Sequence, residues 1–150
     1  FRVELGKAEI IREGKDITVI SYGSTLRIVE QAAEELERLG IDIEIVDPQT
    51  FLPFDLGNLC AESWSKTNKL LVVGDDVPGG SSAFIMQQVL ERQNGYRFLD
   101  GQPHTLTAKP HRTPYGSDGD YFTKPSVDDV VEIVYSMMND SFPDKFPKLF

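Results

Sequence analysis

Two glycine-containing segments carry the residues best placed to bind an anion. The first, Gly23-Ser24-Thr25, follows an apolar run of β-branched residues and opens a helical pattern. The second, Gly79-Gly80-Ser81, stands in the same position between a later apolar run and another helical pattern. Backbone N–H groups and hydroxyls at the start of a helix can hold a phosphate or a carboxylate. Both segments are therefore candidate anion sites, and the alternative at each is a plain strand-to-helix turn.

The second segment falls short of a nucleotide-binding loop. Gly74 and Gly79 have the spacing of the loop that cradles phosphates, but that loop needs a lysine where this sequence has Gly80. Asp75 and Asp76 would also repel phosphates, and a helix dipole worth about 0.3 to 1 kcal/mol could not offset this. The G-x-G-x-x-G dinucleotide fingerprint is absent. Nucleotide binding is disfavoured, and no cofactor-binding residue is assigned.

Residues that could hold a metal or act as a nucleophile do not converge. His104 and His111 have no cysteine or carboxylate at zinc-ligand spacing. Asp118 and Asp120 flank a glycine but lack the further oxygen ligands of a calcium loop. Cys60 fits a small buried hydrophobe on a helix. No Gly-x-Ser-x-Gly elbow is present. We therefore assign no catalytic residue and no metal ligand, and expect the isolated domain to be inactive.

The apolar pattern predicts the elements that position these segments. We expect strands at residues 8–11, 17–20, 41–46, 69–74 and 104–109, and helices at 25–39, 53–65, 81–92 and 126–138, the last opened by a Ser126–Asp129 capping box. The continuous apolar run at 69–74 predicts a central strand. The alternation of apolar and acidic residues at 41–46 predicts a strand towards the sheet edge with one face in water.

The order of these elements predicts an α/β fold. Two strands open the chain, and from the second of them onwards strand and helix alternate four times. This pattern favours a three-layer α/β/α sandwich with a mostly parallel sheet of about five strands and one antiparallel edge strand. Ligands and partners of such folds meet the loops at the carboxyl ends of the strands. Here those loops are Ser21–Thr25, Gly74–Ser82 and Pro110–Asp120.

Composition limits the partners. The 150 residues suit one domain, which we place at 1–140, and the net charge of −9 disfavours nucleic acid and anionic membrane surfaces. The same charge favours a basic protein partner, unless it serves solubility alone. A single cysteine and the lack of a membrane span or signal segment predict a cytoplasmic location. Because the chain opens on Phe1 rather than Met, we expect it to be a fragment.

The last ten residues form a separate tail rich in phenylalanine and proline. Phe142, Phe146 and Phe150 recur every four residues, and Pro143 and Pro147 prevent a regular helix. Exposed aromatic side chains at this density would form an interaction patch, whereas side chains folded back onto the domain would extend its core. The sequence leaves both possibilities open.

Several ordered motifs carry a family resemblance. They are Gly6-Lys-Ala-Glu-Ile-Ile-Arg-Glu-Gly14, Tyr22-Gly23-Ser24, Asp47-Pro-Gln-Thr-Phe-Leu-Pro-Phe-Asp55, Leu71-Val-Val-Gly-Asp-Asp76 with Gly79-Gly80, and Thr113-Pro114-Tyr115. The Asp-x-x-Thr-x-x-Pro-x-Asp stretch is the most specific of them. Over nearly its whole length the chain resembles the C-terminal domain of the transketolase family, and most of all that of the β subunit of 2-oxoacid dehydrogenase E1 enzymes.

The resemblance implies a part of an oxidoreductase that decarboxylates a 2-oxo acid with thiamine diphosphate and magnesium and passes the acyl group to lipoyl-bearing E2. In that family other domains hold the cofactor, and Gly116-Ser-Asp-Gly119 here is only superficially like their thiamine motif. The C-terminal domain instead supports a homodimer or heterotetramer, contributes to the surface that binds the E2 subunit-binding domain, and is proposed to bind regulatory anions. The alternative is a stand-alone module that binds a small anion or a nucleotide.

Overall fold

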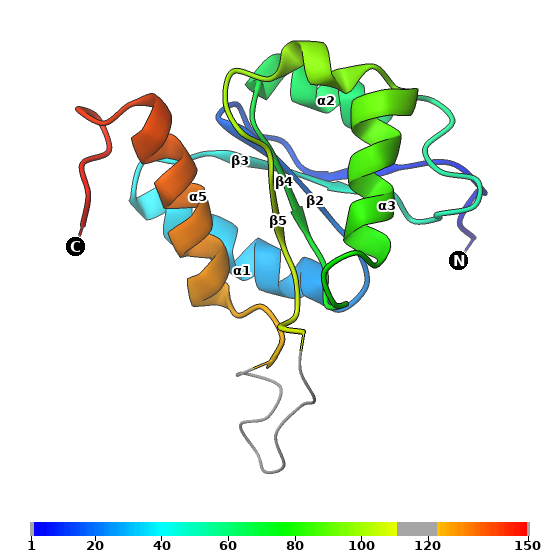
Figure 1. Cartoon of the computed structure of the whole chain (residues 1–150), viewed down its shortest axis with the longest axis horizontal. Coiled ribbons are helices and arrows are strands. Elements are labelled where there is room, and N and C mark those ends of the chain that lie inside the picture. The colour runs from blue at the N-terminus through cyan, green and yellow to red at the C-terminus, as the bar shows by residue number, and fades with distance from the viewer. Residues whose placement is uncertain (1, 111–122, 150) are drawn as a thin grey trace.

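The computed structural model describes residues 2–110 and 123–149, which form five strands packed between helices (Figure 1). The strands are β1 (Glu9–Arg12), β2 (Ile17–Ser21), β3 (Ile43–Asp47), β4 (Leu70–Val73) and β5 (His104–Leu106). The helices are α1 (Thr25–Arg38), α2 (Leu59–Thr67), α3 (Ser81–Gln87), the π-helix η1 (Gln88–Arg92), the 3-10 helix η2 (Gly95–Phe98) and α5 (Val127–Ser141). None of these helices is long and apolar enough to cross a membrane.

The sheet has the order β1-β3-β2-β4-β5. Strand β1 pairs with β3 antiparallel at one edge, and all other pairs are parallel. Val19 of β2 lies opposite Ile45 of β3 on one side and Leu71 of β4 on the other. The predicted mostly parallel sheet with one antiparallel edge strand is confirmed, and β4 lies inside the sheet as its apolar run predicts.

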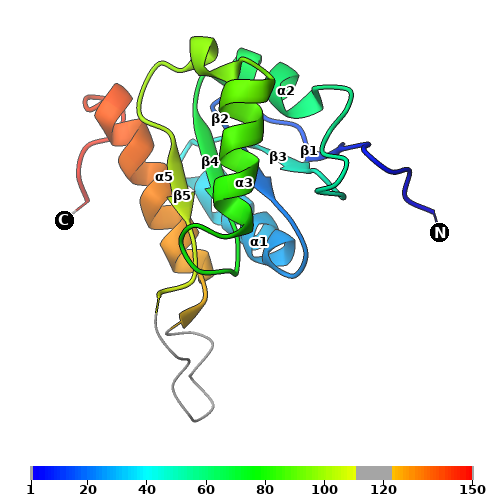
Figure 2. The same ribbon diagram turned by 45° about the vertical axis from the view of Figure 1, so that its right-hand side comes forward.

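Two helical layers cover the sheet (Figures 1 and 2). Helices α1 and α5 pack against each other on one face, and α2 and α3 cover the other. Alternate side chains of each strand enter opposite cores, as the two-residue period of a strand requires. Val19, Ile45 and Leu71 belong to the core under α1 and α5, whereas Ile20 and Val72 belong to the core under α2 and α3. The three-layer sandwich is therefore as predicted.

Helix α5 begins at the expected capping box and ends in the tail. The backbone N–H of Asp129 donates to Ser126 Oγ at 3.2 Å, and Ser126 N donates back to the Asp129 carboxylate at 2.9 Å. In the tail Phe146 is buried in the core beside Tyr135, whereas Phe142 is about half exposed. Of the two possibilities left open for the tail, extension of the core therefore holds for Phe146.

One helix prediction was wrong in detail. Helix α2 begins at Leu59 rather than Pro53, because the Asp55 carboxylate accepts the N–H groups of Leu59 and Cys60 and starts the helix there. The helix predicted at 81–92 has the expected extent, since α3 continues into the π-helix η1, which ends at Arg92. Most of the predicted 110–125 loop lies outside the described residues.

Candidate functional site

Two of the three predicted ligand loops lie beside each other at the carboxyl ends of β2 and β4. These strands are neighbours in the sheet, but β2 leads to α1 on one face and β4 leads to α3 on the other. The two loops therefore run to opposite faces of the sheet, which makes this position its topological switch point. Ser21 Oγ donates to the carbonyl of Val73 at 2.9 Å, and the Tyr22 hydroxyl donates to Asp76 Oδ1 at 3.0 Å. The third loop lies outside the described residues from position 111 to 122.

The first loop leaves the start of α1 without a side-chain cap. Gly23 has a φ of +61°, which turns the chain from strand into helix. Ser24 stands at the capping position, but its side chain accepts no N–H of the helix, and Thr25 Oγ1 donates instead to the carbonyl of Tyr22 at 2.6 Å. Ser24 and Thr25 are both residue types that can cap a helix, but neither hydroxyl does so here, since Thr25 is buried and turned towards the strand. The first turn of α1 also has no acidic residue.

A pocket of about 470 Å³ lies between the starts of α1 and α5. Ser24 and Ser126 line it together with Lys124, and Asp75 and Asp128 add negative charge. The uncapped start of α1 and Lys124 favour a small anion, while the two carboxylates oppose one. The first predicted anion segment thus faces a real pocket, and anion binding there stays a prediction.

The second predicted anion segment already faces a carboxylate of the protein. The Asp76 carboxylate lies against Gly80, where a Cβ would overlap it unless the carboxylate moved. Asp76 Oδ2 is buried and has no hydrogen-bond partner among residues 2–110 and 123–149. Burial raises the pKa of Tyr22 to about 12, with a hydrogen bond from Ser81 acting against the shift and Asp76 adding to it. These contacts weigh against a second anion at Gly79, Gly80 and Ser81, because like charges would meet.

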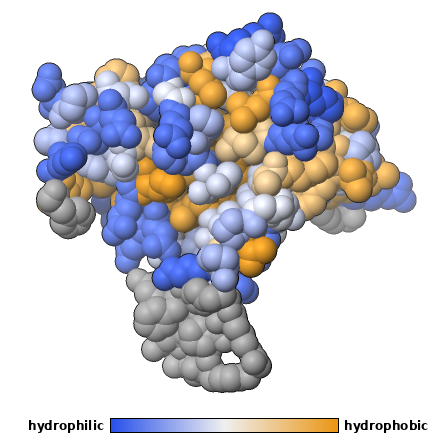
Figure 3. All heavy atoms as spheres, in the orientation of Figure 1, coloured by the Kyte–Doolittle hydropathy of each residue, from blue (hydrophilic) through white to orange (hydrophobic). Residues whose placement is uncertain are grey.

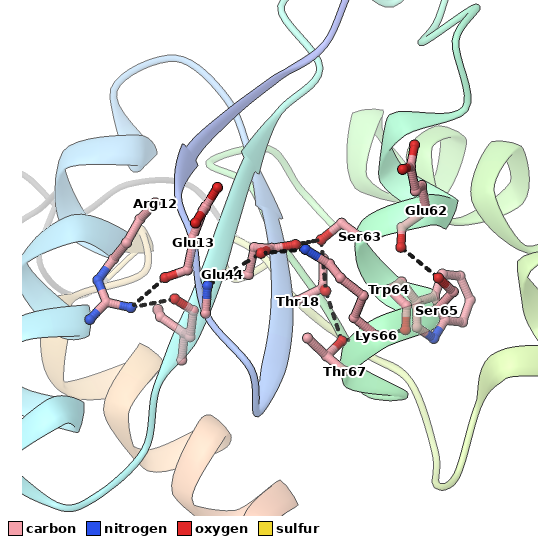
Figure 4. Close-up of polar contacts among 12 residues, drawn as sticks. Arg12, Glu13, Thr18, Glu44, Glu62, Ser63, Trp64, Ser65, Lys66 and Thr67 are labelled. Atoms are coloured by element: carbon pink, nitrogen blue, oxygen red, sulfur yellow. Dashed lines mark hydrogen bonds and ion pairs between the residues drawn. The ribbon is translucent and has the colours of Figure 1, made fainter.

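A buried polar network on the α2 side of the sheet was missed by sequence reasoning (Figure 4). Glu44 of β3 is fully buried, although the alternating pattern predicts that its face is in water. Its carboxylate accepts hydrogen bonds from Ser63 Oγ, from Lys66 Nζ at 3.0 Å and from the backbone N–H of Gly14 at 3.2 Å. Thr18 Oγ1 continues the network to Ser63 at 3.1 Å.

Strand β3 lies next to the edge strand β1, which agrees with a place towards the sheet edge, but its predicted face in water is wrong. Strands pair with β3 on both sides, and its buried acidic side chain is satisfied by partners from α2. A carboxylate with this many partners holds elements together and does not offer a reactive oxygen. The only sequence signal was the spacing of Ser63, Lys66 and Thr67, which places three polar side chains on one face of α2.

The single cysteine is structural. Cys60 is fully buried on α2, and burial raises the pKa of its thiol well above the usual value, with the neighbouring Asp55 carboxylate adding to the shift. A thiol in this state is a poor nucleophile. Within residues 2–110 and 123–149, no group of three or more His, Cys, Asp or Glu side chains could hold a metal ion.

The fold and the site together define an α/β domain of the doubly wound type, with paired loops at the switch point and buried polar contacts that fix its helices. The chain matches the profile of the family described as "Transketolase, C-terminal domain" over residues 6–129. It therefore belongs to this family, as the ordered motifs predict.

Known relatives narrow the resemblance to E1 β subunits. The chain is 36% identical over 135 residues to the pyruvate dehydrogenase E1 component subunit beta of Rhizobium meliloti, which covers 89% of this chain and 29% of the relative. It is 46% identical over 89 residues to the 2-oxoisovalerate dehydrogenase subunit beta of Bacillus subtilis, covering 59% of this chain and 26% of the relative. The chain thus spans less than a third of the length of these two relatives.

A solved structure confirms the fold. The chain described as "Split gene transketolase, inactive beta4 tetramer" superposes with a TM-score of 0.70 at 21% identity, covering 91% of this chain and 43% of that one. At this identity the likeness supports the architecture alone.

Proposed function

We propose that this chain is the C-terminal, non-catalytic assembly domain of a thiamine-diphosphate-dependent 2-oxoacid dehydrogenase E1 component. Its parent would decarboxylate a 2-oxo acid oxidatively and transfer the acyl group to lipoyl-bearing E2 in the cytoplasm. The observation that carries the proposal is the family match joined to the similarity with E1 β subunits of pyruvate and 2-oxoisovalerate dehydrogenases. The domain supports dimerisation and E2 docking, and the remaining domains of E1 supply the chemistry.

The described residues do not fit thiamine diphosphate. Asp76, whose carboxylate lies against Gly80, follows β4 at the switch point, and the pocket at the start of α1 contains Asp75 and Asp128. A diphosphate placed at either loop would meet fixed negative charge that the start of one helix does not offset. The cofactor and its magnesium ion are therefore assigned to other domains of the parent.

An exposed leucine patch supports contact with those other domains or chains. Leu5, Leu52 and Leu56 are 70%, 84% and 63% exposed. They lie close together, because Leu56 N donates to the carbonyl of Gly6 at 2.8 Å and a Cβ at Gly6 would come within 3.0 Å of Pro53. Clustered apolar side chains in water mark a surface that another protein covers, and permanent interfaces are the more apolar ones.

Calorimetry tests the proposal. Thiamine diphosphate with magnesium is titrated into the 150-residue chain and, in parallel, into the parent chain assembled with its E1 α partner. We expect heat of binding from the assembled enzyme and none from the chain, since the cofactor site lies elsewhere. Saturable micromolar or tighter binding to the 150-residue chain would overturn the assignment.

A small-anion module is the second candidate, favoured by the uncapped start of α1 and its pocket with Lys124. Crystals soaked in phosphate or small carboxylates would show density at Ser24 if this function holds. Empty density at high anion concentration would leave only the assembly role.

A further inference from the structure

The segment that leads into the domain, residues 2–8, is held by the loop that follows β3, residues 47–56. Gly6 N donates to Thr50 Oγ1 at 2.8 Å, and Leu56 N donates to the carbonyl of Gly6 at 2.8 Å. Gly6 is buried, and its φ of +77° turns the chain between these two contacts. Both backbone polar groups of Gly6 are therefore paired with the loop. We call residues 2–8 the entry segment and residues 47–56 the entry clamp.

The entry clamp contains the Asp-x-x-Thr-x-x-Pro-x-Asp stretch, and the three polar positions of that stretch each fix part of the loop. Asp47 Oδ1 accepts from Gln49 N at 2.9 Å. Thr50 Oγ1 donates to the carbonyl of Pro53 at 2.7 Å. The Asp55 carboxylate joins the end of the clamp to the start of α2. The most specific motif of the sequence thus shapes the loop that holds the entry segment.

The clamp is also anchored in the domain by aromatic side chains. Phe54 is 4% exposed in the core under α2 and α3, and its carbonyl accepts from Arg92 Nη2 at 2.7 Å. The Phe51 ring packs edge-on against Tyr22, with centroids 4.9 Å apart, and lies 6.4 Å from the ring of Phe84 on α3. Because the clamp is tied to α3, η1 and the loop after β2, the core of the domain fixes the direction of the entry segment.

The leucine patch lies at the same place. Leu5 belongs to the entry segment, and Leu52 and Leu56 belong to the clamp. A hollow of about 410 Å³ beside them is lined by residues 4–8, 55–57 and 59. Figure 3 shows hydrophobic residues gathered on the side of the molecule that carries α3 and the N-terminal end. An apolar surface where the chain enters the domain is the first surface that a preceding domain would meet.

We propose that the entry clamp and the leucine patch form a rigid joint, on which the part of the parent chain that precedes Leu5 packs. The inference rests on the proposed function, because it needs a parent in which other domains come before this one. That preceding part is tethered beside the patch, so the contact is intramolecular and costs little association entropy. A second copy is untethered and would need roughly 800 Å² on each partner, more than three leucine side chains supply. The joint therefore sets the angle between this domain and the one before it.

Hydrogen exchange tests the clamp in the 150-residue chain. Thr50→Val keeps the shape of the side chain and removes both of its hydrogen bonds, whereas Thr50→Ser keeps the hydroxyl. We expect the Gly6 amide to exchange about tenfold faster in Thr50→Val, and to stay within about twofold of the wild-type rate in Thr50→Ser. The Cys60 amide, which Asp55 holds, is the internal control and should keep its rate in both variants. A Gly6 amide that Thr50→Val does not accelerate would overturn the clamp.

Limited proteolysis tests the joint in the parent chain assembled with its E1 α partner. Leu52→Ser removes an apolar side chain that is 84% exposed, and Leu149→Ser makes the same change at a 57% exposed position of the tail. We expect Leu52→Ser to raise the rate of cleavage between the domains about fivefold, and Leu149→Ser to change it less than about twofold. The thermal midpoint of the 150-residue chain should be the same for the wild type and both variants, since neither side chain is buried in it.

The outcomes separate this inference from the proposed function. Faster Gly6 exchange in Thr50→Val, with no change in cleavage on Leu52→Ser, would show that the preceding domain does not cover the patch, and would overturn the joint. Equal increases with Leu52→Ser and Leu149→Ser would overturn it too, because cleavage would not depend on the patch. If Leu52→Ser releases the E1 α partner in light scattering and leaves cleavage unchanged, another chain covers the patch and the proposed occupant is wrong. The proposed function survives each of these results, and it fails if the 150-residue chain binds thiamine diphosphate.

Discussion

Under α2 the sheet buries a connected set of polar side chains, whereas the core under α1 and α5 is mainly apolar, apart from the hydrogen-bonded pair Ser21 and Thr25 at the start of α1. Glu44, Ser63 and Thr18 form one polar chain on the α2 side, and Asp55 with Gln93 forms a second at the start of the helix. On the other side Val29, Leu36 and Val134 meet Ile43 and Ile45 with apolar contact alone. On the outer surface the charged side is the other one. The α2 and α3 side is electrically balanced, and the α1 and α5 side is acidic.

This difference shows how one small domain can serve two kinds of contact. Directional hydrogen bonds fix α2 and the loop before it in a single arrangement, so the neighbouring leucine patch has a constant shape. Such a surface suits a permanent apolar interface. Non-directional apolar packing needs no buried charge under α1 and α5, and their ionised side chains remain on the outside, where they make that surface acidic.

The largest expected change in stability comes from a substitution in the C-terminal tail, which packs on the α1 and α5 side. Phe146→Ala removes a buried ring from the core under α1 and α5 and should lower the free energy of unfolding by about 3 kcal/mol. Phe142→Ala is the control, since this ring is 48% exposed and its main partner is the Lys69 ammonium at 5.2 Å, so we expect a loss of about 1 kcal/mol. Urea unfolding of both variants measures the difference. Equal losses would show that the Phe146 ring is not part of the core under α1 and α5.

The second largest expected change in stability comes from the buried polar network around Glu44. Glu44→Gln keeps the shape of the side chain but removes the charge that pairs with Lys66, and it places an amide donor among donors. We expect a loss of about 2 kcal/mol in the free energy of unfolding. Glu34→Gln on the exposed side of α1 makes the same chemical change and should stay within about 0.5 kcal/mol. Similar values for the two variants would mean that the two sides of the sheet do not differ as described.

Much of the fold follows from local patterns. The unbroken apolar run at β4 predicted its central place, the helical period predicted α1 and α5, and Ser126 with Asp129 predicted the start of α5. Each of these features depends on neighbours in the sequence, so spacing alone is sufficient. The anion loops were likewise placed at the switch point by the alternation of strands and helices.

The main failure, the burial of Glu44, depends on neighbours distant in sequence, and the others depend on which of several nearby partners a side chain chooses. The burial of Glu44 requires that β1 pair outside β3 and that α2 bring Ser63 and Lys66 to it, which no local pattern encodes. The late start of α2 depends on Asp55, whose position is held by Gln93 from the end of η1. Whether a glycine turn is open to an anion depends on which side chain occupies it, and at Gly80 that side chain is Asp76.

The smallest expected effect is on the pKa of Tyr22, whose hydroxyl joins the two loops at the switch point. With a folded-state pKa of about 12 against an ordinary value of 10.0, Tyr22 favours its protonated form, so its contribution to stability is complete below pH 10 and is lost as pH rises towards 12. Asp76→Asn removes the carboxylate charge but keeps a hydrogen-bond acceptor, so the pKa should fall yet stay above 10, because burial is the largest cause of the shift. The titration is followed by tyrosine absorbance, with Tyr22→Phe subtracted to isolate this residue from the other four tyrosines. A Tyr22 pKa that does not move on Asp76→Asn would mean that the Asp76 carboxylate does not act on this hydroxyl. The electrostatic argument against an anion at Gly80 would then lose its support.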